Sequence, residues 1–250
     1  MARRAFGVLE FERPAIHDAQ VVTPIDLAAE RIIIDHLLLE FPDHSIRSEE
    51  SGTVGKESDW LWLVDPLDGT SNFSLGIPQF GITIALLHHG QPVLGVVVST
   101  HAETTLVGIK GRGARKHVRG RYTELKSPSV LQDVVALEQG YETPRGSSGL
   151  SALRDGAESS FSRVLYNWAP SIDTVLLVEG SVCGVIGFQC SGLERAACLL
   201  VAQEAQLLVF QSTDRDEFGI PKDFIICWPS VQEKVLPLAA TLPHTVALVS

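Results

Sequence analysis

Two carboxylates and a peptide carbonyl directly follow an apolar run in the first third of the chain. Residues 60–64, WLWLV, have the length and side chains of a buried β-strand. In the next residues, DPLDGT, Asp65 and Asp68 flank the carbonyl of Leu67. An aspartate is costly to ionise inside a hydrophobic sheet, but at the end of a strand it meets water or a metal. These three oxygens can therefore converge on one hard cation such as Mg²⁺.

Gly69 and Thr70 come next and suggest a place for an anion beside that cation. If a helix begins here, its free backbone N–H groups and its dipole would hold a phosphate. The alternative is an ordinary turn with a helix cap, because Asp, Gly, Thr and Asn are all common in turns.

Four further acidic residues lie at the ends of expected elements. Asp26 falls in the first turn of an amphipathic helix that Thr23 caps, so capping alone would explain it. Glu49 and Glu50 follow a short strand, where adjacent carboxylates repel unless a cation is present, although such pairs are also common on solvated surfaces. Glu194 begins a helical segment, a position that favours an acid even without a metal.

The motif at residues 65–73, DPLDGTSNF, resembles the DPxDGTxNF signature of the inositol monophosphatase family, which are lithium-sensitive, magnesium-dependent phosphomonoesterases. Three shorter stretches, VVTPID at 21–26, SEES at 48–51 and LERAA at 193–197, are similar to other elements of the same family. The resemblance runs from about Val21 to Ala205. It implies an α/β fold, a layered αβαβα sandwich of the sugar-phosphatase type, that holds two or three Mg²⁺ ions and forms a homodimer.

The resemblance also implies a role for each residue of these motifs. The implied metal ligands are Glu49, Asp65, the carbonyl of Leu67, Asp68 and Glu194. The implied catalytic residues are Asp26 and Thr70, which would orient a water, with Glu50 as a helper. The backbone of Gly69 and Thr70 would hold the phosphate.

Several positions depart from the family pattern. Trp168 and Ala169 stand where glycine and serine are usual, which narrows the substrate side of the pocket, and Glu194 replaces an aspartate. Residues 181–192 hold no carboxylate at the place where the family recognises inositol, so strict inositol specificity is not expected. Ala169 and Gly187 are weaker candidates for a neutral pocket around the substrate.

The order of apolar segments indicates two halves. Residues 80–87, 91–100 and 104–109 alternate as in an antiparallel meander of a large sheet. Beyond a change of composition near residue 126, apolar runs alternate with helical segments, as in a second α/β layer. We therefore expect an N-terminal half over residues 1–126 and a C-terminal half over residues 127–250 that completes the site.

Composition excludes several classes of protein. A formal charge of −10 argues against a general binder of nucleic-acid polymers, and no apolar run is long enough for a membrane span, so a cytoplasmic protein is expected. The four cysteines have no zinc-site spacing and are expected to be reduced and buried. Residues 110–121 hold six basic side chains, which predicts either a solvated hairpin tip or a rim that attracts anions.

The predicted function is hydrolysis of a small phosphate monoester, such as inositol monophosphate or a related sugar phosphate, by a metal-activated water. A 3′-phosphonucleotide or fructose 1,6-bisphosphate is an alternative substrate. A non-catalytic, phosphatase-like scaffold is an alternative from another class, because of the changes at Trp168, Ala169 and Glu194.

Overall fold

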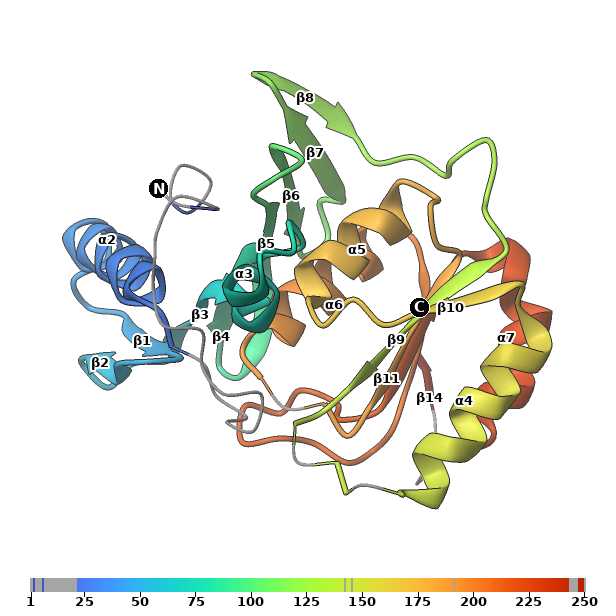
Figure 1. The fold of residues 1–250 in the computed structure, drawn as a ribbon. Helices are drawn as coiled ribbons and strands as arrows, with labels where there is room; N and C mark the ends of the chain where they lie inside the picture. The colour runs from blue at the N-terminus through green and yellow to red at the C-terminus, as the bar shows by residue number, and fades with distance from the viewer. Residues whose placement is uncertain are drawn as a thin grey trace.

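Two β-sheets with helices outside and between them form this chain, as the computed structural model shows (Figure 1). The structure describes residues 2, 6, 22–141, 143, 144, 146–190, 192–242 and 247–249. The sequence of the first twenty residues predicts at most a short helix that is broken near Pro14, and this segment lies almost wholly outside the described residues.

The first sheet has eight strands in the order β2-β1-β3-β4-β5-β6-β7-β8, in which only the β1–β3 pair is parallel. Its strands are β1 (Ser45–Ser48), β2 (Gly52–Gly55), β3 (Trp60–Asp68), β4 (Gly81–His88), β5 (Gln91–Ser99), β6 (Thr104–Ile109), β7 (Ala114–Val118) and β8 (Arg121–Glu124). The predicted meander is confirmed as β4, β5 and β6. The basic segment 110–121 is more regular than a hairpin tip, because it contains strand β7 and the turns on either side of it.

The second sheet has six strands in the order β10-β9-β11-β13-β12-β14. Its strands are β9 (Val134–Gln139), β10 (Arg163–Leu165), β11 (Gly184–Phe188), β12 (Leu208–Gln211), β13 (Phe224–Cys227) and β14 (Ala247–Val249). The sequence has apolar runs at residues 134–137, 164–166, 182–188 and 207–210, which match β9, β10, β11 and β12, and the first three of these strands pair in parallel. The chain passes from the first sheet to the second between β8 and β9. The division of the chain into two halves at residue 126 stays a prediction.

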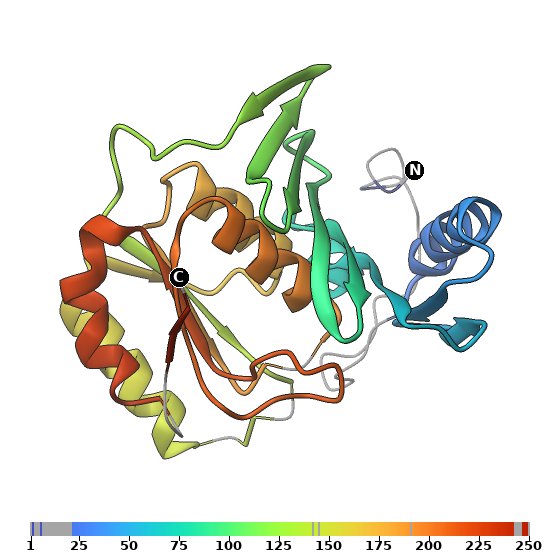
Figure 2. The same ribbon diagram turned by 180° about the vertical axis from the view of Figure 1, so that it is seen from behind.

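The helices complete five layers. Helix α2 (Pro24–Glu40) packs on β3, helices α5 (Pro170–Val178) and α6 (Glu194–Glu204) lie between the sheets, and α4 (Ser148–Ser160) and α7 (Gln232–Ala239) cover the outer face of the second sheet (Figure 2). Two short helical segments remain: α3 (Thr70–Leu75) connects β3 to β4, and η1 (Pro229–Val231) leads from β13 into α7. The predicted layered αβαβα sandwich is confirmed.

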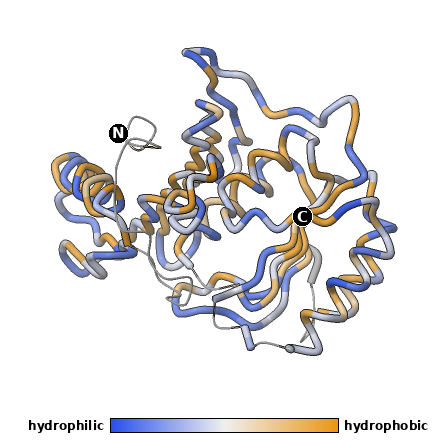
Figure 3. Tube along the Cα trace, viewed as in Figure 1, coloured by the Kyte–Doolittle hydropathy of each residue, from blue (hydrophilic) through white to orange (hydrophobic). Residues whose placement is uncertain are grey.

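Helix α6 lies unusually close to the first sheet because two strand positions are glycine. A Cβ at Gly95 would come within 2.8 Å of the carbonyl oxygen of Ala197, and one at Gly108 within 2.9 Å of the Cα of Val201. The apolar strands of the second sheet, visible in orange in Figure 3, close the core from the other side. This packing fixes the start of α6, where Glu194 lies.

The four cysteines, Cys183, Cys190, Cys198 and Cys227, are all buried and free, as predicted. Among the described residues, the search for a helix of sufficient length and apolar character to cross a membrane finds none.

Candidate active site

Strand β3 continues four residues past the predicted end at Val64 and carries both aspartates. Asp65 pairs with Thr83 and Asp68 with Gly81, and the register shifts between these two pairs. The shift falls at the Pro-Leu dipeptide, where proline has no N–H to donate. The backbone N–H of Leu67 instead donates to Asp65 Oδ1 at 3.0 Å. Both aspartates thereby face one cavity while remaining nearly buried, at 6% and 5% exposure.

Gly69 makes the sharp turn from β3 into α3. Its φ of +85° is accessible to glycine without strain, and a Cβ here would come within 2.8 Å of the carbonyl oxygen of Gln79. Helix α3 begins at Thr70, as the sequence predicts. The N–H groups of Gly69 and Thr70 therefore lie at the start of a helix on the cavity wall.

Asp26 joins the helix cap to Thr70. Thr23 caps α2, and both its backbone N–H and its hydroxyl donate to Asp26 Oδ2, at 2.8 and 2.5 Å. The hydroxyl of Thr70 lies 2.9 Å from Asp26 Oδ1 and 2.7 Å from the carbonyl oxygen of Leu67. The predicted capping and the contact to Thr70 are thus combined in one buried carboxylate.

Glu49 and Glu50 lie in the turn between β1 and β2, and a third acid holds this turn. Glu30 of α2 accepts hydrogen bonds from the backbone N–H groups of Glu50 and Ser51, at 3.1 and 2.9 Å, and from the Ser51 hydroxyl at 2.6 Å. Glu30 is 3% exposed. Helix α2 therefore positions two parts of the site, one through Asp26 and one through Glu30.

The start of α5 reaches across to the aspartates of β3. The backbone N–H of Ser171 donates to Asp68 Oδ2 at 2.6 Å, and Asn72 Nδ2 donates to the carbonyl oxygen of Asn167 at 2.6 Å. Ala169 lies so close to Gly69 that a Cβ on the glycine would be 3.0 Å from that of the alanine. The segment that contains Trp168 and Ala169 therefore packs directly on Gly69, one of the two predicted phosphate-binding residues.

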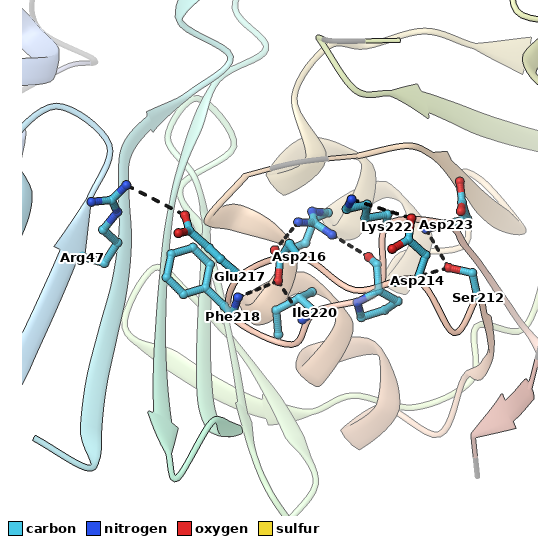
Figure 4. A network of polar contacts seen from close by, with 11 residues as sticks. Arg47, Ser212, Asp214, Asp216, Glu217, Phe218, Ile220, Lys222 and Asp223 are labelled. Carbon is cyan, nitrogen blue, oxygen red and sulfur yellow. Dashed lines mark hydrogen bonds and ion pairs between the residues drawn. The ribbon is translucent and has the colours of Figure 1, made fainter. Parts of the chain in front are cut away.

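The loop between β12 and β13 lines another side of the cavity, and Figure 4 shows its polar contacts. Asp216 Oδ2 lies 2.5 Å from Arg195 Nη2, and Asp216 Oδ1 accepts from the backbone N–H groups of Phe218 and Ile220. Glu217, at the tip of the loop, lies 3.9 Å from Arg47 of β1. The loop thus spans from the helix that carries Glu194 to the strand that leads to Glu49.

One cavity of about 870 Å³ collects these groups. This volume falls within the usual range of small-molecule sites, roughly 300–1,000 Å³. Its lining includes nearly all of the predicted site residues, namely Glu49, Glu50, Asp65, Leu67, Asp68, Gly69, Thr70, Ala169 and Glu194, and Asp26 reaches it through Thr70.

Two predicted features lie elsewhere. Gly187 belongs to β11, where its Cα faces the ring of Phe224, and it is not among the described residues that line the cavity. A Cβ there would approach that ring to 2.3 Å, so the glycine is required by packing between strands. The basic segment 110–121 contributes no lining residue either, because β7 and β8 lie at the far edge of the first sheet.

The cavity is strongly acidic. Burial, followed by the negative charge of Glu194, raises the pKa of Glu49 to about 7 and that of Asp68 to about 8. Burial also raises the pKa of Asp65 and of Glu194, and the charges of Glu49 and Asp68 add to the shift of Asp65. Arg47 is the one basic side chain among the described residues of the lining. The charge of the buried Arg195 lowers the pKa of Glu194, but the described lining offers the other carboxylates little positive charge to stabilise their ionised forms.

Comparison with known proteins identifies the family. The family model of the inositol monophosphatase family matches residues 8–217. The chain belongs to the inositol monophosphatase family. A fructose-1,6-bisphosphatase/inositol-1-monophosphatase of Thermotoga maritima is 27% identical over 216 residues, covering 86% of this chain and 81% of the relative.

Other relatives carry different names. Nus factor SuhB of Haemophilus influenzae is 31% identical over 220 residues, covering 83% of this chain and 81% of the relative. A solved structure described as an IMPase/NADP phosphatase complexed with Mg²⁺ and phosphate has the same fold, with a TM-score of 0.72 and 20% identity, and the match covers 94% of this chain and 87% of that one. Membership of the family thus makes phosphatase activity plausible and leaves the substrate open.

The donor set of the cavity fits the magnesium expected in this family. Carboxylate and carbonyl oxygens are the ligands that Mg²⁺ prefers. Burial and the charge of Glu194 raise the pKa of Glu49 and of Asp68, so a cation beside them would favour their ionised forms. Among the described residues, however, no group of three or more His, Cys, Asp or Glu side chains is arranged to hold a metal ion as it stands.

Sequence reasoning missed several residues of the site. Glu30 could have been found, because it lies four residues after Asp26 on the same face of the helix. Glu138, at the end of β9, lines the cavity, and burial together with the charge of Asp173 raises its pKa. No motif marks Glu138 or the loop residues Asp216 and Glu217, because only the packing of the second sheet brings them to the cavity.

Proposed function

We propose that this chain hydrolyses small phosphate monoesters in a magnesium-dependent reaction. The observation that carries the proposal is the convergence of Glu49, Asp65, Asp68, Glu194 and the Leu67 backbone on one cavity that has Arg47 as its basic residue within the described lining. These groups come from three distant parts of the chain. A surface turn or a simple helix cap would not require all of them to face one cavity.

Two Mg²⁺ ions fit this donor set. Glu49, Asp65 and the carbonyl of Leu67 would hold the first, and Asp65, Asp68 and Glu194 the second. When bound, Mg²⁺ supplies Lewis-acid activation of water and of the phosphate. Because glutamate is one methylene longer than aspartate, Glu194 would bind Mg²⁺ with its side chain drawn back or with the second ion slightly shifted.

The chain itself would orient the reacting groups. The Thr70 hydroxyl is held between Asp26 and the Leu67 carbonyl, and there it would accept a hydrogen bond from a water in the cavity. The N–H groups of Gly69 and Thr70 would bind the phosphate oxygens at the start of α3. Glu50 would assist from the neighbouring turn.

The experiment is phosphate release from a panel of monoesters with and without Mg²⁺. We expect turnover that requires the cation and is inhibited by Li⁺, and we expect Asp65→Asn to abolish it. Asp59→Asn is the matched control, because Asp59 lies just before the same strand but is exposed and outside the cavity lining. Full activity in Asp65→Asn would refute the proposed ligand set.

A non-catalytic binding role is the second candidate. It is favoured by relatives named Nus factor SuhB and by the Trp168-Ala169 and Glu194 changes. A folded protein whose melting temperature rises with Mg²⁺, but which releases no phosphate from any ester of the panel, would support this role instead. The sedimentation coefficient of the same samples tests the proposed homodimer. A separate measurement with added RNA tests the proposal that the protein does not bind nucleic-acid polymers.

A further inference from the structure

Three exposed aromatic side chains line the cavity. Tyr141 is 57% exposed, Tyr166 39% and Trp168 53%, and each follows or precedes a different element of the C-terminal half. The guanidinium carbon of Arg154 lies over the ring of Tyr166, 5.6 Å from the ring centroid. Tyr141 and Trp168 contact no other ring or cation within the described residues. Large rings that remain exposed in a ligand cavity mark a binding surface.

The fold holds Trp168 in place. Its φ of +55° is a conformation that bulky residues rarely adopt, so the backbone is held there by its neighbours. The carbonyl of Asn167 accepts from Asn72 Nδ2, and Ala169 packs against Gly69. The residue next to Trp168, Ala169, therefore contacts Gly69, and Trp168 is fixed beside the turn that we propose to bind the phosphate.

The charges of the cavity restrict what else the ligand contains. Within the described lining, Arg47 is the one cation, and Glu217 lies 3.9 Å from it and partly neutralises it. The basic segment 110–121 is remote from the cavity. A second phosphate, as in fructose 1,6-bisphosphate, would thus meet mainly carboxylates, whereas an uncharged planar ring would meet aromatic faces.

We propose that the preferred substrate is a phosphate monoester whose alcohol portion bears a planar aromatic ring, as a nucleoside monophosphate does, and that Trp168 stacks on that ring. Tyr141 and Tyr166 supply the remaining walls of the ring-binding surface. This inference rests on the proposed phosphatase function for its kinetic consequence, but the stacking itself does not depend on hydrolysis. Trp168, which stands where glycine is usual in the family, would then determine which substrate is preferred.

The kinetic test compares adenosine 2′-, 3′- and 5′-monophosphate with inositol 1-phosphate and glycerol 2-phosphate. We expect kcat/KM to be at least tenfold higher for one or more of the nucleotides, and we expect Trp168→Gly to remove that preference mainly through KM. The glycine variant relieves the backbone strain at φ +55°, so it keeps the fold. Trp168→Phe should retain most of the preference. Tyr122→Leu is the matched control, because Tyr122 is 70% exposed on β8, away from the cavity.

A binding test separates this inference from the proposed function. Adenosine, which has no phosphate, should quench the tryptophan fluorescence of the wild-type protein saturably, and the quenching should vanish in Trp168→Phe, where Trp60, Trp62 and Trp228 remain. Hydrolysis with equal kcat/KM for polyol and nucleotide esters would overturn the inference and leave the phosphatase proposal standing. Saturable quenching without hydrolysis of any ester would support the stacking surface and refute the phosphatase. Quenching that is absent in the wild type, or unchanged in Trp168→Phe, would overturn the inference.

Discussion

The guanidinium of Arg195 lies 2.5 Å from Asp216 Oδ2. Because Arg195 directly follows Glu194, this ion pair joins the β12–β13 loop to the start of α6. Arg195 is buried, with 1% of its side chain exposed, and its Nη1 also donates to the carbonyl oxygen of Pro221 at 2.5 Å. One side chain thereby fixes both the loop that closes the cavity and the first turn of α6. The charge of Arg195 also lowers the pKa of Glu194 against the opposing effect of burial.

Replacing Arg195 should destabilise the protein strongly. In Arg195→Met the carboxylate of Asp216 loses its charged partner in a nearly dry setting, and we expect the free energy of unfolding to fall by about 3 kcal/mol. Urea denaturation measures this loss. Lys222→Met is the control, because Lys222 makes an exposed ion pair with Asp214 in the same loop, and it should cost less than about 1 kcal/mol. Equal losses in the two variants would show that the buried pair does not hold the loop.

Glu30→Ala should weaken cation binding without removing any proposed ligand. The change leaves the N–H groups of Glu50 and Ser51 without their acceptor, so the turn that carries Glu49 loses its position. We expect the half-saturating Mg²⁺ concentration for phosphate release to rise severalfold and the free energy of unfolding to fall by about 1–3 kcal/mol. Glu40→Ala, at the exposed end of the same helix, should change neither quantity. An unchanged Mg²⁺ dependence in Glu30→Ala would contradict the positioning role.

The sequence predicts the parts of this site that lie at the ends of regular elements. Asp65 and Asp68 follow an apolar strand, and Asp26 follows a helix cap, so local pattern is enough to find them. The strand itself extends further than expected, to Asp68, because the irregular pairing around Pro66 allows polar residues to stay in register with β4. Alternation of side chains alone could not reveal that irregularity.

Contacts between elements that are distant in the sequence could not be predicted in the same way. The hydrogen bond from Ser171 to Asp68 joins residues 103 positions apart, and no local pattern encodes it. Gly187 was assigned to the pocket from its place in the family pattern, yet the ring of Phe224 on the neighbouring strand decides its environment. Tertiary packing, and not the motif, determines which side chains of the second sheet reach the cavity.

The stability of the cation-free protein should fall as the pH rises through the neutral range. Asp68 has a pKa near 8 in the folded state against an ordinary value of 3.8, and Glu49 has about 7 against 4.5. Between those limits the folded state binds more protons than the unfolded state, so each rise in pH favours unfolding. We expect the melting temperature to decrease from about pH 5 to pH 8, measured by calorimetry in the presence of a chelator.

Two controls isolate the carboxylates as the cause of this slope. Asp68→Asn carries no titrating group at this position and should flatten the dependence. Mg²⁺ should raise the melting temperature more at pH 8 than at pH 5.5, since the ionised carboxylates bind the cation and the protonated ones do not. A dependence that is as steep in Asp68→Asn as in the wild type would assign the slope to other groups.

Thr70→Val should separate catalysis from folding. Valine keeps the shape of threonine but removes the hydroxyl that lies between Asp26 and the Leu67 carbonyl. That hydroxyl has a single proton, so it can donate to only one of its two acceptors at a time, and burial raises the pKa of Asp26. If Thr70 orients the attacking water, kcat should drop by about a hundredfold or more while the KM for the ester changes little. Thr70→Ser, which restores the hydroxyl, should recover most of the rate, and a serine variant as slow as the valine variant would show that the methyl group, rather than the hydroxyl, is what the site requires.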